Sequence, residues 1–282
     1  MRVVLTGGTG YIGSAVLRQL LEQGHEVTAV VRSDASADIV RGAGAHPALG
    51  DLSDVAWFGA VLADADGAIH TADLGGAGDD AVLDAVESAF GGTDRPYVHT
   101  GGVWSWGSGA ELTEESPLAP PALTAWRAAR EARILDADVA AAVIAPGVVY
   151  GHGGGIPLGV LAGSRDAEGV VTLVGAGGQH WSSVHVDDLA ELYVLALEQH
   201  ATGVFIGAAG INPTVRELGE AISGSVRAES DEASRARLGA GFADALLLDQ
   251  QASGEKARTV LGWSPSRPSV LDELRDLAPT AV

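Results

Sequence analysis

The 282-residue chain contains no cysteine. This absence excludes disulfide bonds, a thiolate nucleophile and any zinc or iron–sulfur site that needs cysteine ligands. Lysine is almost absent too, because Lys256 is the only one among the seventeen basic residues. No apolar run reaches the length of a membrane span, since charged or polar residues interrupt every one.

Positive charge is scarce, and the formal net charge is −20 at pH 7. Such a surface repels nucleic acid and anionic membranes, so we expect neither as a partner. The first residues, MRVVLTGGTG, enter a strand pattern without the basic and apolar regions of a signal peptide. We expect a soluble, cytoplasmic monomer or homodimer that acts on a small molecule.

Short β-branched runs alternate with helical patterns through the first half of the chain, which predicts a doubly wound α/β fold with a parallel sheet. A helix is expected over 122–131, and another over 185–200 with Asp187 as its cap. The predicted strands are 2–6, 26–31, 45–50, 67–72, 96–100, 139–146 and 203–208. We expect residues 1–146 and 185–210 to form the dinucleotide-binding core, and residues 147–184 and 211–282 a small substrate-binding lobe.

The stretch TGGTGYIG, residues 6–13, lies between a predicted strand and a predicted helix. Gly8, Gly10 and Gly13 satisfy the pattern G-x-G-x-x-G, and Gly7, Gly10 and Gly13 satisfy G-x-x-G-x-x-G. Glycines let the backbone approach a pyrophosphate, whose charge then lies at the helix N-terminus. In this context the motif predicts a dinucleotide site rather than a tight turn without a ligand.

The end of the second strand indicates which dinucleotide is bound. Arg32 and Ser33 follow this strand, and a guanidinium suits the 2′-phosphate of NADP. Asp34 is one residue further and remains an alternative acceptor for the ribose of NAD, in which case Arg32 is a solvated loop residue. Asp51 and Leu52, after the third strand, are candidates for adenine contact, although Asp51 could equally belong to a helix cap.

With TGGTGYIG, GDLSD, APGVVYGHGGG and HVDDLAELYVLALE, the whole chain resembles the extended short-chain dehydrogenase/reductase superfamily, in its NAD-dependent epimerase/dehydratase-like branch. The resemblance implies a Rossmann fold of about seven strands, bound NAD(P)H and a C-terminal substrate lobe. It also implies cofactor contacts from Gly7, Thr9, Gly10, Tyr11, Ile12, Gly13, Asp51, Leu52, Thr71, Ala72, Pro146 and Val148.

The chemistry of that superfamily uses a Ser or Thr after the fifth strand and a Tyr-x-x-x-Lys pair on the next helix. Thr100 falls at the hydroxyl position. No tyrosine has a lysine four residues later, and alignment on Glu131 places Leu123 and Arg127 at the two positions instead. This Leu-x-x-x-Arg resembles an atypical subgroup with a His-x-x-x-Arg type of pair, but departs from it at the leucine.

Arg127 is a candidate for ribose contact and for stabilising a developing alkoxide. Its pKa is too high for proton donation near neutrality. The simpler alternative is an i,i+4 pair with Glu131 on a solvated helix face. His70 and His99 are expected to be buried and hydrogen-bonded. We therefore expect a water molecule to supply the proton by way of Thr100. His180 and His185 lack partners at the sequence spacing of a metal site, and we predict none.

Trp104 and Trp181 are candidates for lining a cleft that takes an apolar or aromatic substrate, and Leu123 and His152 are further candidate contacts. The sequence thus favours an NADP-dependent oxidoreductase acting on a small, apolar carbonyl or imine compound. The alternatives are a redox-inactive NADP(H)-binding sensor or regulator, and a sugar-nucleotide epimerase, dehydratase or lyase-type enzyme.

Overall fold

A computed structural model describes residues 1–277. Seven strands form one sheet in the order β12-β7-β5-β4-β1-β2-β3, and every neighbouring pair is parallel. Their bounds are β1 Arg2–Thr6, β2 Glu26–Val31, β3 His46–Leu49, β4 Gly67–His70, β5 Thr93–Thr100, β7 Val139–Pro146 and β12 Gly203–Gly207. The predicted doubly wound α/β fold is confirmed.

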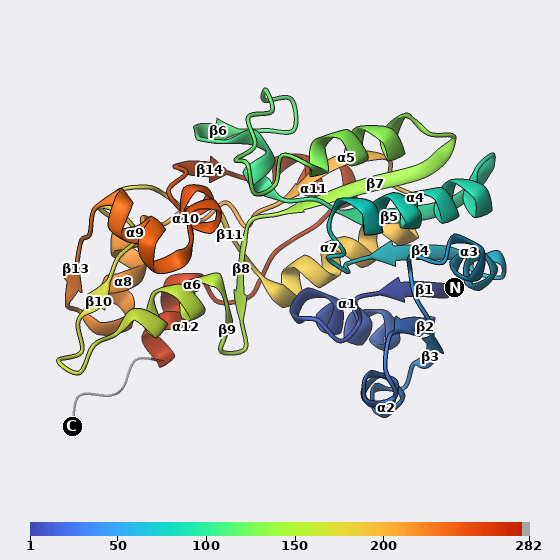
Figure 1. Cartoon of the computed structure of the whole chain (residues 1–282), viewed down its shortest axis with the longest axis horizontal. Coiled ribbons are helices and arrows are strands. Elements are labelled where there is room, and N and C mark those ends of the chain that lie inside the picture. Colours follow the sequence, from blue (N-terminus) through green and yellow to red (C-terminus); the bar gives the residue numbers. More distant parts are fainter. Residues whose placement is uncertain (278–282) are drawn as a thin grey trace.

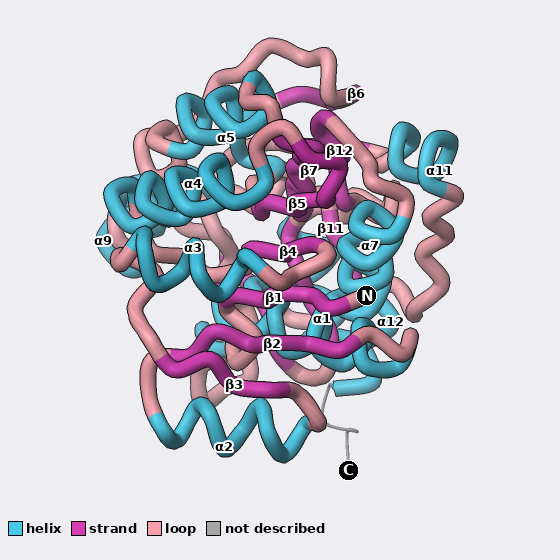
Figure 2. Tube along the Cα trace, turned by 90° about the vertical axis from the view of Figure 1, so that its right-hand side faces the viewer, coloured by secondary structure: helices cyan, strands magenta, loops and turns pink. Residues whose placement is uncertain are grey.

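Helices cover both faces of this sheet (Figure 2). One face carries α1 (Tyr11–Glu22), α7 (Val186–Glu198) and α11 (Glu255–Leu261), and the other carries α3 (Val55–Ala63), α4 (Gly76–Phe90) and α5 (Arg127–Asp136). Helix α2 (Asp34–Ala43) joins β2 to β3. Strands covered on both faces are apolar along their whole length, as in VAAAVIAP of β7.

Two helix starts differ from the sequence prediction. Helix α5 begins at Arg127, because residues 122–126 form turns in which the amides of Thr124 and Ala125 both donate to the carbonyl of Pro121. Helix α7 is capped by His185, whose Nδ1 accepts the amide of Asp187. The expectation that Asp187 is the cap is therefore wrong.

A smaller lobe lies beside the carboxyl ends of the strands, at the left of Figure 1. Its own hydrophobic cluster includes Trp181, Val215 and Leu246. The lobe contains β8 (Val148–Gly151), β9 (Gly154–Gly155), β10 (Val171–Thr172), β11 (Ser183–His185), β13 (Val226–Arg227), α6 (Ile156–Val160), α8 (Val215–Ser223), α9 (Asp231–Leu238), α10 (Ala240–Leu246) and α12 (Val270–Leu277).

Two segments connect the lobe to the core: the pair of strands β6 and β14, and the segment that contains α11. Strand β6 (Gly109–Leu112), which follows β5 and the 3-10 helix Val103–Trp106, pairs with β14 (Gln250–Ala252). Helix α11 and Trp263 pack into the hydrophobic cluster of the core, although the sequence placed residues 211–282 in the lobe.

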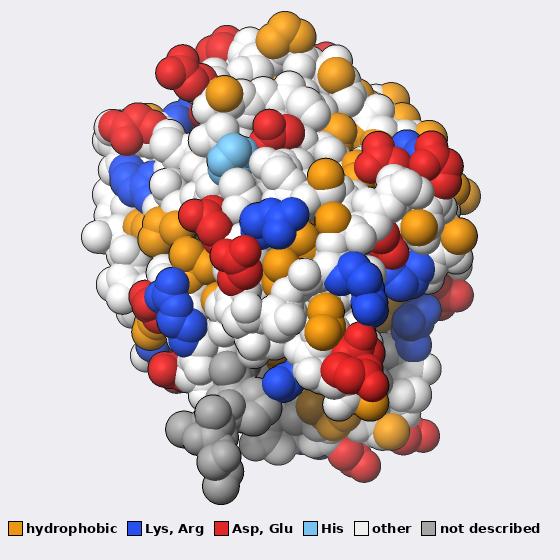
Figure 3. Space-filling view, turned by 90° about the vertical axis from the view of Figure 1, so that its left-hand side faces the viewer, with side chains coloured by type: hydrophobic (Ala, Val, Ile, Leu, Met, Phe, Trp, Pro, Cys, Tyr) orange, Lys and Arg blue, Asp and Glu red, His pale blue; other side chains and the backbone are white. Residues whose placement is uncertain are grey.

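The outer face of the lobe intermixes acidic and basic side chains rather than presenting a field of one sign (Figure 3). In the part of the chain that the structure describes, no helix combines the length and the apolar character needed to cross a bilayer.

Candidate functional site

A cavity of about 330 Å³ opens where β4, β5 and β7 end. It lies at the carboxyl edge of the sheet, where doubly wound folds bind their ligands. Its wall is mostly apolar, and Asp73 and Arg127 are the charged residues among the described ones that line it. The lining residues are Tyr11, Ile12, Thr71, Ala72, Asp73, Thr100, Gly101, Gly102, Val103, Trp104, Ser105, Thr124, Arg127, Pro146, Gly147, Val148, Val149, Gly155 and Ile156.

The glycine loop adjoins this cavity through Tyr11 and Ile12. Gly7 has φ +74°, and a Cβ on Gly13 would lie 2.0 Å from the carbonyl oxygen of Gly7, so both positions require glycine. Helix α1 starts at this loop with no side-chain cap, and Thr9 and Gly10 are exposed. Uncapped amides at a helix start fit the pyrophosphate expected here.

The residues that would select between NAD and NADP lie at the end of β2. Ser33 caps α2 by accepting the amide of Ser36, and Asp34 is the exposed first residue of the helix. Arg32 is exposed, and within residues 1–277 its side chain makes no hydrogen bond or ion pair. Its guanidinium is therefore available to an anionic ligand.

Asp51 and Leu52 lie at the end of β3 and have different environments. Leu52 is buried among Val4 and Phe58, so its side chain packs in the core. Asp51 is exposed and accepts the amide of Ser53, and this hydrogen bond lowers the pKa of its carboxyl. Helix α3 is capped by Asp54 instead. Asp51 stabilises the turn before the helix and is not the helix cap.

Thr71 and Ala72 continue from β4 into the cavity wall. The hydroxyl of Thr71 donates to the carbonyl of Thr6, which joins the end of β4 to the start of the glycine loop. Asp73, the next residue, lines the cavity and pairs with Arg127. Sequence reasoning missed Asp73, although its place directly after Thr71 and Ala72 could have indicated it.

The hydroxyl of Thr100 is fully engaged at the end of β5. Its Oγ1 lies 2.6 Å from the carbonyl oxygen of His70 and 2.7 Å from the hydroxyl of Tyr193. A carbonyl accepts only, so Thr100 donates to His70 and Tyr193 donates to Thr100. Thr100 lines the cavity, but it must release His70 before it can donate to a substrate.

Tyr193 is a buried member of this chain of hydroxyls that the sequence did not reveal. It lies on α7, and burial raises the pKa of its phenol above the ordinary value. Near neutrality Tyr193 therefore donates a hydrogen bond to Thr100 without losing its proton. Only the helical period of α7 could have pointed to it, by placing Tyr193 on the face that meets the sheet.

Arg127 points into the cavity rather than along a solvated helix face. Its guanidinium donates to the carbonyl of Thr100 and to Asp73, at 3.3 Å each, and lies 4.6 Å from the ring centre of Trp126. It forms no ion pair with Glu131, so the i,i+4 alternative is wrong. Glu131 is buried, its Oε1 has no partner among the described residues, and burial raises its carboxyl pKa.

Of the four candidate substrate residues, the structure brings one to the cavity. Trp104 lines it and meets Phe242 edge-on. Trp181 is buried in the lobe and donates to the carbonyl of Leu246. Leu123 is exposed in the turn before α5, because that segment is not helical. His152 lies outside the cavity lining and pairs with Asp187.

The histidines on β4 and β5 form part of a buried network. His70 Nδ1 lies 2.7 Å from the hydroxyl of Thr6, and His99 Nδ1 lies 3.0 Å from that of Tyr97. The two imidazoles stack 5.3 Å apart. Burial holds the pKa of His99 well below its ordinary value. Both side chains are hydrogen-bonded inside the protein, as the sequence predicted, and neither lines the cavity.

The glycine-rich turn between β8 and β9, which we call the flap (residues 151–155), closes one side of the cavity. Tyr11 donates from its hydroxyl to the carbonyl of Gly151, and a Cβ on Gly154 would lie 2.8 Å from the Tyr11 ring. Gly155 lines the cavity itself. The flap therefore rests on the residue that begins α1.

Comparison with known proteins agrees with this geometry. Residues 7–99 match a family model described as NAD(P)H-binding. The uncharacterized protein C2A9.02 of Schizosaccharomyces pombe is 30% identical over 97% of this chain and 98% of its own. The 2-alkyl-3-oxoalkanoate reductase of Stenotrophomonas maltophilia is 31% identical over 72% of this chain and 67% of its own. The chain belongs to the extended short-chain dehydrogenase/reductase superfamily.

A solved structure supports the fold of this superfamily member over its full length. Human epimerase family protein SDR39U1, crystallised with NADPH, has a TM-score of 0.73 and 24% identity, and each chain covers all of the other. Residues 7–99 of this short-chain dehydrogenase/reductase thus match an NAD(P)H-binding domain, which supports a nicotinamide cofactor for this protein.

Proposed function

We propose that this protein is an NADP-dependent oxidoreductase that acts on a small, largely apolar carbonyl or imine compound. The observation that carries the proposal is the mostly apolar cavity beside the glycine loop, with Thr100 and Arg127 at its polar end. Among residues 1–277 the guanidinium of Arg32 has no partner, and this supports NADP rather than NAD, because a 2′-phosphate would supply one.

NADPH, when bound, supplies the hydride. Arg127 fixes the polar end of the cavity, since Asp73 and the Thr100 carbonyl hold its guanidinium on two sides. Its charge stabilises an alkoxide that develops at the reacting centre. Thr100 positions the substrate oxygen by turning its hydroxyl away from His70, and Tyr193 continues to donate to the Thr100 oxygen.

The proton is supplied by water or by the substrate itself. The hydroxyl of Tyr11 is committed to the Gly151 carbonyl and that of Thr71 to the Thr6 carbonyl. Burial raises the phenol pKa of both Tyr11 and Tyr193. A protonated imine brings its own proton, so imines belong among the preferred substrates.

A redox-inactive NADP(H) sensor is the second candidate, and the engagement of these hydroxyls favours it. A sugar-nucleotide epimerase or dehydratase is disfavoured, because Arg127 is the one basic side chain among the described residues lining the cavity. A nucleotide diphosphate is normally held by several such groups.

The test is consumption of NADPH with a panel of aliphatic and aromatic ketones, cyclic imines and nucleotide sugars, for the wild type and Thr100→Val. The proposal expects turnover of an apolar ketone or imine by the wild type and its loss in the variant. Tight NADPH binding without conversion of any panel member would instead support the sensor. Conversion of a nucleotide sugar alone, seen by product analysis without net NADPH consumption, would support an epimerase.

A further inference from the structure

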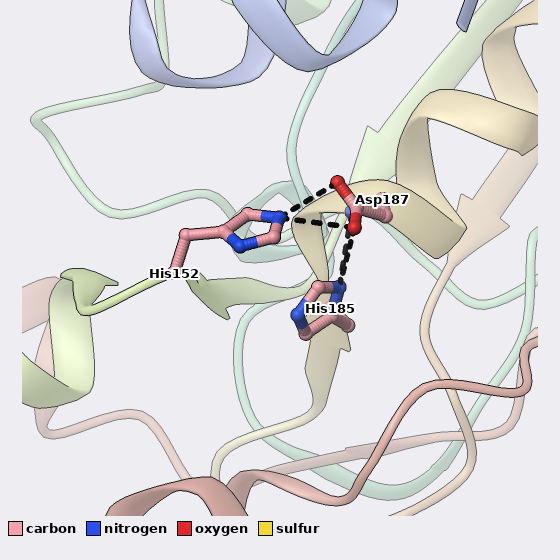
Figure 4. A group of neighbouring side chains, drawn as sticks. All are labelled: His152, His185 and Asp187. Carbon is pink, nitrogen blue, oxygen red and sulfur yellow. Dashed lines mark hydrogen bonds and ion pairs between the residues drawn. The ribbon is translucent and has the colours of Figure 1, made fainter. Parts of the chain in front are cut away.

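Two histidines and an aspartate meet where the flap approaches the start of α7 (Figure 4), and none of the three lines the cavity. His152 is at the flap tip, His185 ends β11, and Asp187 is in the first turn of α7. His152 Nε2 lies 3.0 Å from both carboxylate oxygens of Asp187, and His185 Nδ1 lies 3.9 Å from Oδ2. The three side chains converge although 35 residues separate the first from the last.

The spacing of these atoms suits a small cation. Tetrahedral zinc with bonds near 2.0–2.2 Å separates its ligand atoms by about 3.3 Å. The separations of 3.0 and 3.9 Å bracket that value, and one ligand atom from each residue lies within 4.8 Å of the others. The imidazole of His152 is exposed, which leaves an entry path and room for water as a fourth ligand.

His185 has the tautomer that metal binding at Nδ1 requires, with no proton on Nδ1. Its Nδ1 accepts the amide of Asp187, so this nitrogen carries a lone pair. The proton is then on Nε2, which lies 3.5 Å from Oε2 of Glu273 on α12. In metal sites, a histidine that binds the ion usually donates a hydrogen bond from its other ring nitrogen to a carboxylate or a carbonyl. Metal binding at Nδ1 replaces one cap hydrogen bond.

Two arginines, Arg18 and Arg267, place positive charge beside the carboxylate of Asp187. Arg18 of α1 pairs with Oδ1 at 2.5 Å, whereas the carboxylate oxygen near His185 Nδ1 is Oδ2. Arg267 lies 3.7 Å from Oδ2, where it competes with a cation, and 3.9 Å from Glu191, which offers it another partner. The positive end of α7 adds to this competition. We therefore expect weaker binding than at a buried structural zinc site.

We propose that His152, His185 and Asp187 bind a divalent transition-metal cation of the zinc type. Imidazole and carboxylate together favour such an ion over calcium or magnesium, which prefer oxygen ligands. Binding ties the flap tip to the start of α7. Because Gly155 of the flap lines the cavity, the occupied site holds the flap over the cofactor.

The test uses protein without a polyhistidine tag, titrated with Co²⁺ by visible absorption and with Zn²⁺ by calorimetry. The proposal expects one ion per chain and visible bands of a low-symmetry site. His152→Ala should weaken binding at least tenfold, and Arg267→Ala should strengthen it. His180→Ala is the matched control, because His180 also pairs with a carboxylate, Asp249 at 2.8 Å, but has no second histidine beside it.

A thermal melt separates binding from misfolding. His152 has φ +53° and pairs with Asp187, so His152→Ala should melt slightly below the wild type without metal. Zn²⁺ should raise the Tm of the wild type and of His180→Ala, but not that of His152→Ala. No Co²⁺ binding by the wild type, or binding that is unchanged in His152→Ala and lost in His180→Ala, would overturn the proposal. Neither readout depends on NADPH or on turnover, so the outcome is independent of the proposed function.

Discussion

The hydroxyl oxygens of Tyr193 and Thr100 lie 2.7 Å apart, although 93 residues separate them in the chain. Tyr193 donates a hydrogen bond to the oxygen of Thr100, and Thr100 donates one to the carbonyl of His70. This order connects α7 to the ends of β4 and β5, where the cavity opens. The Thr100 hydroxyl, which would anchor a substrate, is therefore also hydrogen-bonded to Tyr193 on α7.

Tyr193→Phe removes the donor behind Thr100. We expect a stability loss of about 1 kcal/mol for the lost hydrogen bond. We expect a lower kcat with an unchanged NADPH Kd, because Thr100 keeps its donation to His70 but loses its second constraint. Thermal melts, NADPH titration and steady-state kinetics measure the three quantities. A variant that matches the wild type in kcat would remove Tyr193 from the account.

Arg127→Ala removes the guanidinium from the cavity. Charge-assisted hydrogen bonds contribute roughly 1.5–3 kcal/mol, so NADPH affinity should fall about tenfold or more. Arg127→Lys keeps the charge and should retain part of the affinity. Arg130→Ala, on the same helix and paired with Asp80, is the control. Equal NADPH affinity in the wild type and Arg127→Ala would place Arg127 outside the cofactor site.

Arg32→Ala tests the choice between the two dinucleotides. The exposed guanidinium has no protein partner among residues 1–277, so its removal should leave stability unchanged. We expect NADPH affinity to fall about tenfold, as for one lost charged contact, while NADH affinity stays the same. Parallel titrations with both nucleotides measure this. An equal loss of affinity for NADPH and NADH would show that Arg32 does not bind the 2′-phosphate.

Glu131→Gln tests the buried carboxyl beneath Gly101. Burial raises the pKa of Glu131, so the folded protein keeps a proton that the unfolded chain releases at the ordinary pKa. The stability from Glu131 is present below that ordinary pKa and is lost as pH rises through the raised one. Glutamine cannot ionise, so the variant should gain stability relative to the wild type across this interval.

Denaturant unfolding at a series of pH values measures the Glu131 effect. Glu111→Gln, at an exposed position, should follow the wild type throughout. A stability difference between Glu131→Gln and the wild type that does not change with pH would show that the pKa of Glu131 is the same in the folded and unfolded states.

The fold was predictable because its signals are local. Alternating apolar strands and helical patterns, with a glycine loop between the first pair, define a doubly wound sheet without long-range information. Strand β7 begins and ends where the sequence predicted. The start of α5 was not predictable from helical spacing, because the turns after Pro121 replace the first helical residues and move Leu123 out of the cavity.

The cavity was only partly predictable, since its contacts join distant segments. Thr100 and Arg127 were found from their positions in motifs. Tyr193 was not, because only the packing of α7 on the sheet brings it to Thr100. The sequence-based argument against a metal site examined neighbours along the chain, whereas the fold brings His152 to Asp187. Trp181 was misplaced because an aromatic residue in a lobe packs its core as readily as it lines a cleft.

The most direct test of the central claim is a fluorescence titration of the purified wild-type protein with NADPH and, separately, with NADH. The account predicts saturable binding of both at the glycine loop, with NADPH bound more tightly because of Arg32. If neither nucleotide binds, the account is contradicted, since the roles proposed for Thr100, Arg127 and Arg32 depend on a nicotinamide cofactor in this cavity.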